Sequence, residues 1–231
     1  MKTIRFPQTL AAIALALSAS AALALSLADL SNKDATSGVK TALEKGADVA
    51  VSKLGQQNGF LNNEKVKIQL PSVLDNAMPL LKMTGQGKKL DDLQVSMNHA
   101  AESAVAMAKP LLINAVRNMS VTDAKNILTG GDTSVTDFFR AKTAAPLGKQ
   151  FLPIVKGITD KNGLSSKYNG LMGKVGGTLH VPDDQKTVEG YVTQRALDGL
   201  YLMIGEEEKA IRKDPVGTGS AILSKVFGAV K

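Results

Sequence analysis

Cysteine and tryptophan are absent from the 231 residues of this chain, histidine occurs twice, and aromatic residues make up 4% of the sequence. Without thiols the chain has no disulfide, no thiolate metal site, no cysteine nucleophile and no thiol for a lipid anchor. The two histidines, His99 and His180, are too few for a histidine-based transition-metal centre. His99 and Glu102 share one face of a predicted helix, which favours a hydrogen-bonded histidine. We predict neither a metal site nor a cofactor.

Signals for catalysis are equally few. No G-x-S-x-G motif is present, and neither histidine has a nearby partner typical of a catalytic triad. The segment 217–220 (GTGS) precedes a predicted helix, but it lacks the lysine and the strand of a phosphate-binding loop and is typical of a helix N-cap. These gaps favour a non-enzymatic protein.

The chain has one long apolar run, and it lies at the N-terminus. Two positive residues, Lys2 and Arg5, precede an apolar segment that ends in an Ala-Leu-Ala cleavage pattern at 22–24. This arrangement is typical of a secretory signal peptide, and the run is too short to span a bilayer comfortably. We predict that residues 1–24 are a cleaved signal peptide. Residues 25–231 then form one soluble domain in the periplasm, without a transmembrane segment.

Positive charge exceeds negative charge, but it is scattered along the chain. The formal net charge is +7, and loss of Lys2 and Arg5 with the signal peptide lowers it to +5. Dispersed lysines indicate a charge that keeps the protein in solution, so we predict no nucleic-acid partner. The excess is compatible with weak attraction to an anionic membrane surface. A periplasmic protein or a small ligand remains open as the partner.

Apolar residues recur at helical spacing over most of the mature chain. Prolines at 79, 110 and 153 are expected to kink or restart the helices that contain them. Capping residues and glycines separate the segments. Helices are predicted over 34–54, 72–83, 90–119, 120–128, a segment that begins at 132, 146–159, 165–175, 188–213 and 221–227.

One segment departs from helical spacing. Val66, Ile68 and Leu70 alternate with polar residues like a short strand, and 178–181 is its only plausible partner by composition. The prediction is therefore a mostly α, irregular multi-helix bundle with at most one short two-stranded β element.

The densest apolar periodicity lies in 188–204, and the same helical wheel continued through Gly205 places Glu206 and Glu207 on the apolar side. A carboxylate that faces a core must be paired, hydrogen-bonded or protonated. Both glutamates are therefore the best functional candidates in the chain. Two structural alternatives remain open: Gly205 ends or kinks the helix and turns both acids to water, or cations neutralise them.

The cations chosen to accompany these acids come from another predicted helix. Arg140 and Lys142 follow Phe138 and Phe139, which are expected to anchor that helix in the core. Glu208 and Arg212 are four residues apart and are predicted to form an ordinary surface pair. The candidate functional cluster is Glu206, Glu207, Arg140, Lys142 and Arg212.

Four motifs resemble a known family: FLNN (60–63), LTGGD (128–132), FFRAKTAAPL (138–147) and ALDGLYLMIGEEEKAIRKDPVGTGS (196–220). They are similar to the exported bacterial family catalogued as domain of unknown function four-one-nine-seven, from about residue 27 to residue 227. The resemblance implies an exported, mostly helical protein of Gram-negative bacteria. It implies no activity, ligand or catalytic residue.

Three functional hypotheses follow. The first is a non-enzymatic periplasmic scaffold or binding protein that acts through a groove or a partner surface. The second is an ion-binding protein or enzyme that uses Glu206 and Glu207 with Arg140 or Arg212. The third is a carrier of apolar ligands, which the interior rich in methionine and leucine favours.

Overall fold

The computed structural model describes residues 31–131, 133–161, 163–175 and 182–229. All regular structure in these ranges is helical, which confirms the all-α class. None of the helices described is long and apolar enough to cross a bilayer. The elements in chain order are α1 (Asn32–Leu54), α2 (Ser72–Met83), α3 (Gly87–Val105), α4 (Lys109–Arg117), α5 (Val121–Thr129), α6 (Ser134–Thr159), α7 (Gly163–Val175), the short 3-10 helix η2 (Asp183–Gln185), α8 (Val188–Lys213) and α9 (Ala221–Gly228).

Local sequence signals set several of the helix ends. Pro110 lies in the first turn of α4, where a missing N–H costs nothing, so the predicted break at this proline is confirmed. Ser120 and Asp123 form the capping box that opens α5. The Thr187 side chain accepts the Gly190 N–H at the start of α8.

Two prolines do not interrupt the long helix α6. Pro146 and Pro153 both lie inside one helix that begins at Ser134 and ends at Thr159, so the prediction of a separate helix from 146 is wrong. Both prolines are exposed. We attribute the continuity to this exposure, because carbonyl groups freed on the outer side of a helix can bond water instead.

The segment predicted as a strand forms none within the described residues, because Val66 lies in a turn and residues 67–71 have no regular structure. Val66, Ile68 and Leu70 are buried, as their alternation predicted. The Asn98 side chain accepts the Ile68 N–H at 2.8 Å and donates to the Ile68 carbonyl oxygen at 2.9 Å. One carboxamide thus takes the place of a neighbouring strand. The predicted partner, 178–181, lies outside the described residues.

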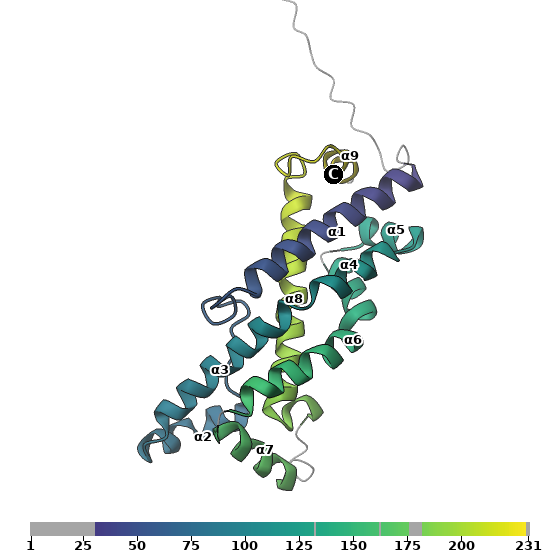
Figure 1. The fold of residues 1–231 in the computed structure, drawn as a ribbon. Coiled ribbons are helices and arrows are strands. Elements are labelled where there is room, and N and C mark those ends of the chain that lie inside the picture. Colours follow the sequence, from purple (N-terminus) through teal and green to yellow (C-terminus); the bar gives the residue numbers. More distant parts are fainter. Residues whose placement is uncertain (1–30, 132, 162, 176–181, 230–231) are drawn as a thin grey trace, which may run out of the picture.

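Helix α8 lies at the centre of the arrangement. It packs against α1, α3 and α6, and Figure 1 shows it passing behind these helices along much of the molecule. Its buried stripe confirms the predicted apolar arc. The fully buried members of that stripe are Val188, Val192, Ala196, Leu200, Tyr201 and Ile204.

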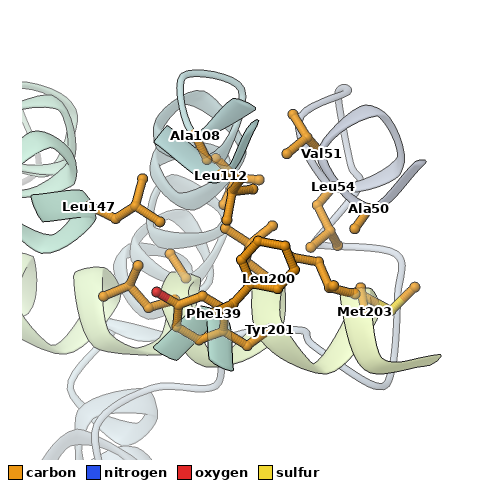
Figure 2. Packing of buried hydrophobic residues seen from close by; sticks show 14 of the residues in the cluster. Ala50, Val51, Leu54, Ala108, Leu112, Phe139, Leu147, Leu200, Tyr201 and Met203 are labelled. Atoms are coloured by element: carbon orange, nitrogen blue, oxygen red, sulfur yellow. The ribbon is translucent and has the colours of Figure 1, made fainter. Parts of the chain in front are cut away.

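Tyr201 of α8 is the largest fully buried side chain of the core. Figure 2 shows it with Leu200 facing Phe139 and Leu147 of α6, and with Leu54 of α1 nearby. Its hydroxyl group lies 2.9 Å from the Thr143 hydroxyl group, so the buried oxygen has a hydrogen-bond partner. Burial raises the pKa of Tyr201 above its usual value.

Candidate functional site

The two glutamates chosen from the sequence lie at the edge of the bundle. The Glu206 side chain is 34% exposed, and its carboxylate lies 2.6 Å from the Lys65 ammonium group. The Glu207 side chain is 21% exposed and lies at the same distance from Lys53. The hydrogen bond from Lys65, followed by its charge, holds the pKa of Glu206 below its usual value. Both pairs join α8 to the end of α1 or to the segment that follows it.

The acid that α8 carries into the core is Glu208. It is 1% exposed and accepts a hydrogen bond from Arg212. The Arg212 guanidinium group also donates to the carbonyl oxygens of Ile127 at 2.6 Å and Leu128 at 3.3 Å, and it lies 5.4 Å from the Phe227 ring centre. The predicted pairing of Glu208 with Arg212 is confirmed, but its predicted location on the surface is wrong. This pair is internal and connects α8 to α5 and α9.

The phase of the helix explains the difference. Helix α8 continues through Gly205 without a break. Ile204, Glu208 and Ile211 share the face that the core covers. Glu207 begins on the side of α1, where a Cβ atom built on Gly46 would lie 3.7 Å from the Glu207 Cβ atom. Its long side chain then carries the carboxylate outward to Lys53, as charged side chains with apolar stems commonly do.

The predicted cations do not join these acids. Arg140 donates to Asp198 at 3.0 Å, and its guanidinium carbon lies 5.2 Å from the Tyr201 ring centre. Lys142 is exposed. Asp198 precedes Glu206 by eight residues, or about 12 Å along a helix axis. The pairing of Arg140 and Lys142 with Glu206 and Glu207 is therefore wrong, and the five predicted residues belong to separate groups.

Glu207 also lines a cavity of about 320 Å³ between α1 and the end of α8. Lys45 lies in this cavity and donates to the Thr218 carbonyl oxygen at 3.1 Å. Asp214 lies there too and accepts the Gly217 N–H at 2.9 Å. The polar groups of this cavity thus already bond to the protein itself. Across the described ranges, no group of three or more His, Asp or Glu side chains is placed to hold a metal ion.

A different set of residues forms the most organised polar structure, and it surrounds the loop after α1. Glu102 of α3 is 4% exposed. Its carboxylate accepts the backbone N–H groups of Asn58, Phe60 and Leu61 at 3.0, 3.1 and 3.2 Å. Hydrogen bonds to an ionised acceptor are stronger than neutral ones. One buried carboxylate therefore holds the backbone of this loop.

Packing fixes the same loop from a second side. The Phe60 side chain is fully buried. Its ring packs directly against the backbone of α8 at Gly199, where a Cβ atom built on the glycine would lie 2.8 Å from the ring. Asn58 adopts a φ angle of 64°, which asparagine tolerates better than most residues. The Asn58 side-chain oxygen lies 3.1 Å from His99 Nε2.

Sequence reasoning missed Asn98 of α3 and named Glu102 only as a neighbour of His99, without its role in this loop. Asn98 and Glu102 are one turn apart and lie beside the buried residues Ala101 and Val105 on the helical wheel. That position was the available signal, because a polar side chain on an apolar face needs a partner. The partners are backbone groups about 30 to 44 residues earlier in the chain, which no local pattern identifies.

The loop borders an open recess of about 520 Å³ that carboxamide side chains dominate. We call it the amide recess. Its lining residues are Lys53, Gln56, Gln57, Asn58, Gly59, Asn62, Asn63 and Glu64.

Comparison with known proteins identifies the family but no activity. The family model described as a protein of unknown function, DUF4197, matches residues 29–228. The chain belongs to the DUF4197 family. Neither the curated proteins nor the solved structures yield a match. The resemblance stated from the motifs is thereby confirmed.

Two of the four motifs that indicated DUF4197 lie in the loop after α1 and in α8. FLNN (60–63) occupies the loop that Glu102 holds, and the segment 196–220 supplies the second half of α8 with Glu206 to Glu208. In this DUF4197 chain His99 is 38% exposed and lies 3.9 Å from Glu102. His180 lies outside the described residues.

Proposed function

We propose that this protein is an exported, non-enzymatic binding protein of the periplasm. Its helical bundle is the scaffold, and the amide recess contacts the ligand. The observation that carries the proposal is a recess lined by carboxamides on a backbone that the buried Glu102 carboxylate fixes. The N-terminal signal-peptide pattern supports export.

Preorganisation supports the choice of this recess. Loops carry binding residues when a rigid body positions them. Here three hydrogen bonds to Glu102 and the buried Phe60 ring hold the loop before any ligand arrives. A loop that is already ordered loses little conformational entropy on binding. Such order is expected of a binding site. A loop that only joins two helices does not require a buried carboxylate, whose desolvation costs free energy.

The chemistry of the recess favours a neutral, hydroxyl-rich ligand. Each carboxamide offers both donors and an acceptor. Gln56, Gln57 and Asn62 are exposed, and in the described part of the chain no hydrogen bond occupies their side chains. A peptide strand needs a sheet edge or apolar side-chain pockets. The recess has no sheet and no apolar side chain in its lining, so we propose a neutral saccharide.

The two rival functions have weaker support. The ion-binding or enzymatic hypothesis needs available carboxylates, but Glu206, Glu207 and Glu208 each bond a cation that ties α8 to its neighbours or to itself. The carrier hypothesis needs an apolar tunnel. A recess of about 710 Å³ does occur, but all its lining residues belong to the single segment 106–117. It is therefore a depression on the outer face of α4.

The test is an NMR titration of the mature chain with neutral oligosaccharides of glucose and N-acetylglucosamine. Side-chain NH₂ signals of Gln56, Gln57 and Asn62 are expected to shift, with a Kd on the order of 1 mM because no aromatic platform adds stacking energy. Gln56→Ala with Gln57→Ala should weaken binding. The matched control is Asn114→Ala with Asn118→Ala on α4, which should bind normally.

Other results of this titration would contradict the proposal. Absence of shifts in the recess, or equal weakening by the α4 control, would remove the amide recess as the binding site. Shifts caused only by extended peptides would replace the saccharide with a peptide.

A further inference from the structure

The turn between α2 and α3 presents exposed apolar side chains that the fold does not use. Leu80 is 64% exposed and Met83 is 85% exposed. They are three residues apart, so both lie on the outer face of the last turns of α2. Pro79, also exposed, lies on the same side. This face remains open because α2 packs on α3 through its opposite side, where Leu74 is buried.

Every charged residue in the turn itself is positive. Between Leu80 and Leu90 the chain carries Lys82, Lys88 and Lys89 and no acid. All three lysines are exposed. Lys88 approaches Asp92 of the following turn at 3.3 Å, an exposed pair that water and salt screen. We call residues 79–89 the α2–α3 tip.

The tip lies at one end of the molecule. Figure 1 shows α2 and the start of α3 at the end opposite to α9 and the start of α1. Helix α7 lies at the same end, so the tip is approached from the end of the bundle that α2, α3 and α7 form. The amide recess belongs to a separate segment, residues 53–64.

We propose that the α2–α3 tip is an anchor for the surface of an anionic phospholipid bilayer. Leu80 and Met83 enter the boundary between headgroups and acyl chains, and the three lysines approach the phosphates. Exposed apolar residues beside a cluster of lysines are the combination that interfacial membrane binding uses. Charge complementarity selects this partner, since an apolar protein surface would not require three cations around two apolar side chains.

The association is expected to be weak and reversible. Each lysine near an anionic surface strengthens binding by about fivefold at moderate ionic strength. Two apolar side chains alone give little attachment, so binding should require both parts of the tip. Added salt should weaken it, because the Debye length shortens.

The absence of tryptophan makes a direct test available. Met83→Trp introduces a sole tryptophan at the tip, and Val216→Trp introduces one at a distant site that is 74% exposed. Vesicles of phosphatidylcholine with an equal amount of phosphatidylglycerol should shift the emission of Met83→Trp to the blue. The emission of Val216→Trp should stay unchanged, and vesicles of phosphatidylcholine alone should shift neither.

Co-sedimentation of the mature chain with the same vesicles separates the tip from general positive charge. Lys82→Gln, Lys88→Gln and Lys89→Gln together should reduce binding by about a hundredfold. Lys125→Gln, Lys149→Gln and Lys161→Gln together remove the same charge elsewhere and should reduce it far less. Leu80→Ser with Met83→Ser should also abolish sedimentation, while circular dichroism shows that every variant is folded.

Three results would overturn the anchor. They are equal loss in both lysine triples, no binding of the unaltered chain to anionic vesicles, and equal binding to vesicles without anionic lipid. The saccharide titration is independent of these measurements, because the tip supplies no residue to the amide recess.

Discussion

At the scale of single residues, three consecutive glutamates have different environments. Glu206 and Glu207 bond lysines near water, whereas Glu208 is buried with Arg212. An exposed ion pair contributes little to stability, because solvent screens it. A buried pair is different, since removing one partner leaves an uncompensated charge in the core.

Substitution of these glutamates should separate the two environments. Glu208→Gln is expected to lower the free energy of unfolding by about 3 kcal/mol, because the Arg212 charge would lose its buried partner. Glu206→Gln should change it within experimental error. Urea denaturation of both variants measures the difference. Equal stability of the two variants would mean that Glu208 is not the internal acid.

Glu102 has the same importance for the loop after α1. Glu102→Gln retains one acceptor oxygen and adds a donor that faces backbone N–H groups, so we expect a loss of about 2 kcal/mol in the free energy of unfolding. Glu64→Gln is the matched control, since the Glu64 side chain is 85% exposed. A loss no larger than that of the control would show that the carboxylate does not hold the loop.

At the scale of elements, the helical pattern could be predicted wherever the signal is local. The apolar spacing of α1 and α8, the capping box of α5 and the break at Pro110 were all available in the sequence. Local pattern failed where the structure of a segment depends on its surroundings in the folded protein. It failed at Pro146, whose outward ring lets α6 continue.

The candidate site shows the same limit more strongly. Neighbouring acids differ by 100° on a helical wheel, and a step of four residues adds only 40°, so the same wheel also places Glu208 beside Ile204. Local spacing therefore left three adjacent acids as candidates, and the buried contacts of Arg212 with Ile127 and Leu128 show which of them the core covers. The contact of Glu102 with Asn58 and its neighbours spans more than 40 residues and had no local signature. The amide recess could therefore not be found from spacing.

The capping box of α5 gives a test that belongs to this scale. Hydrogen bonds from the Ser120 backbone, then from its side chain, hold the pKa of Asp123 below its ordinary value of 3.8. Because the folded pKa is the lower one, this stabilisation is fully present above the unfolded pKa and is lost as pH falls through the folded value.

Ser120→Ala removes the hydroxyl group and keeps the backbone N–H. The pKa of Asp123 should therefore rise only part of the way to its ordinary value, and stability near neutral pH should fall by about 1 kcal/mol. NMR titration of the Asp123 carboxyl group and thermal unfolding measure the two effects. Thr122→Ala, in the same exposed turn, should cause neither. An unchanged pKa in Ser120→Ala would contradict the role of the hydroxyl group.

At the scale of the whole molecule, the proposals describe an exported body with separate working surfaces. The helices around α8 form the scaffold, residues 53–64 form the amide recess, and residues 79–89 form the tip. The family match over residues 29–228 begins just after the proposed signal peptide.

The proposed export has a direct consequence for the mass of the protein. Mass spectrometry of the periplasmic fraction should find a chain that begins at Leu25, because the Ala-Leu-Ala pattern ends at residue 24. A second pattern of the same kind, Ala-Ser-Ala, lies at 19–21, and a chain that begins at Ala22 would move the cleavage site there. A full-length chain that remains in the cytoplasm would contradict the periplasmic proposal.

The central claim is that a loop without regular structure is as firmly held as the helices around it. Amide hydrogen exchange of the mature chain, followed by NMR, measures this directly at Asn58, Phe60 and Leu61. The N–H groups of these residues should be protected to a degree comparable with amides in α8, and Glu102→Gln should remove that protection while α8 keeps its own. Exchange at the rate of free peptide in the unaltered protein would contradict the claim.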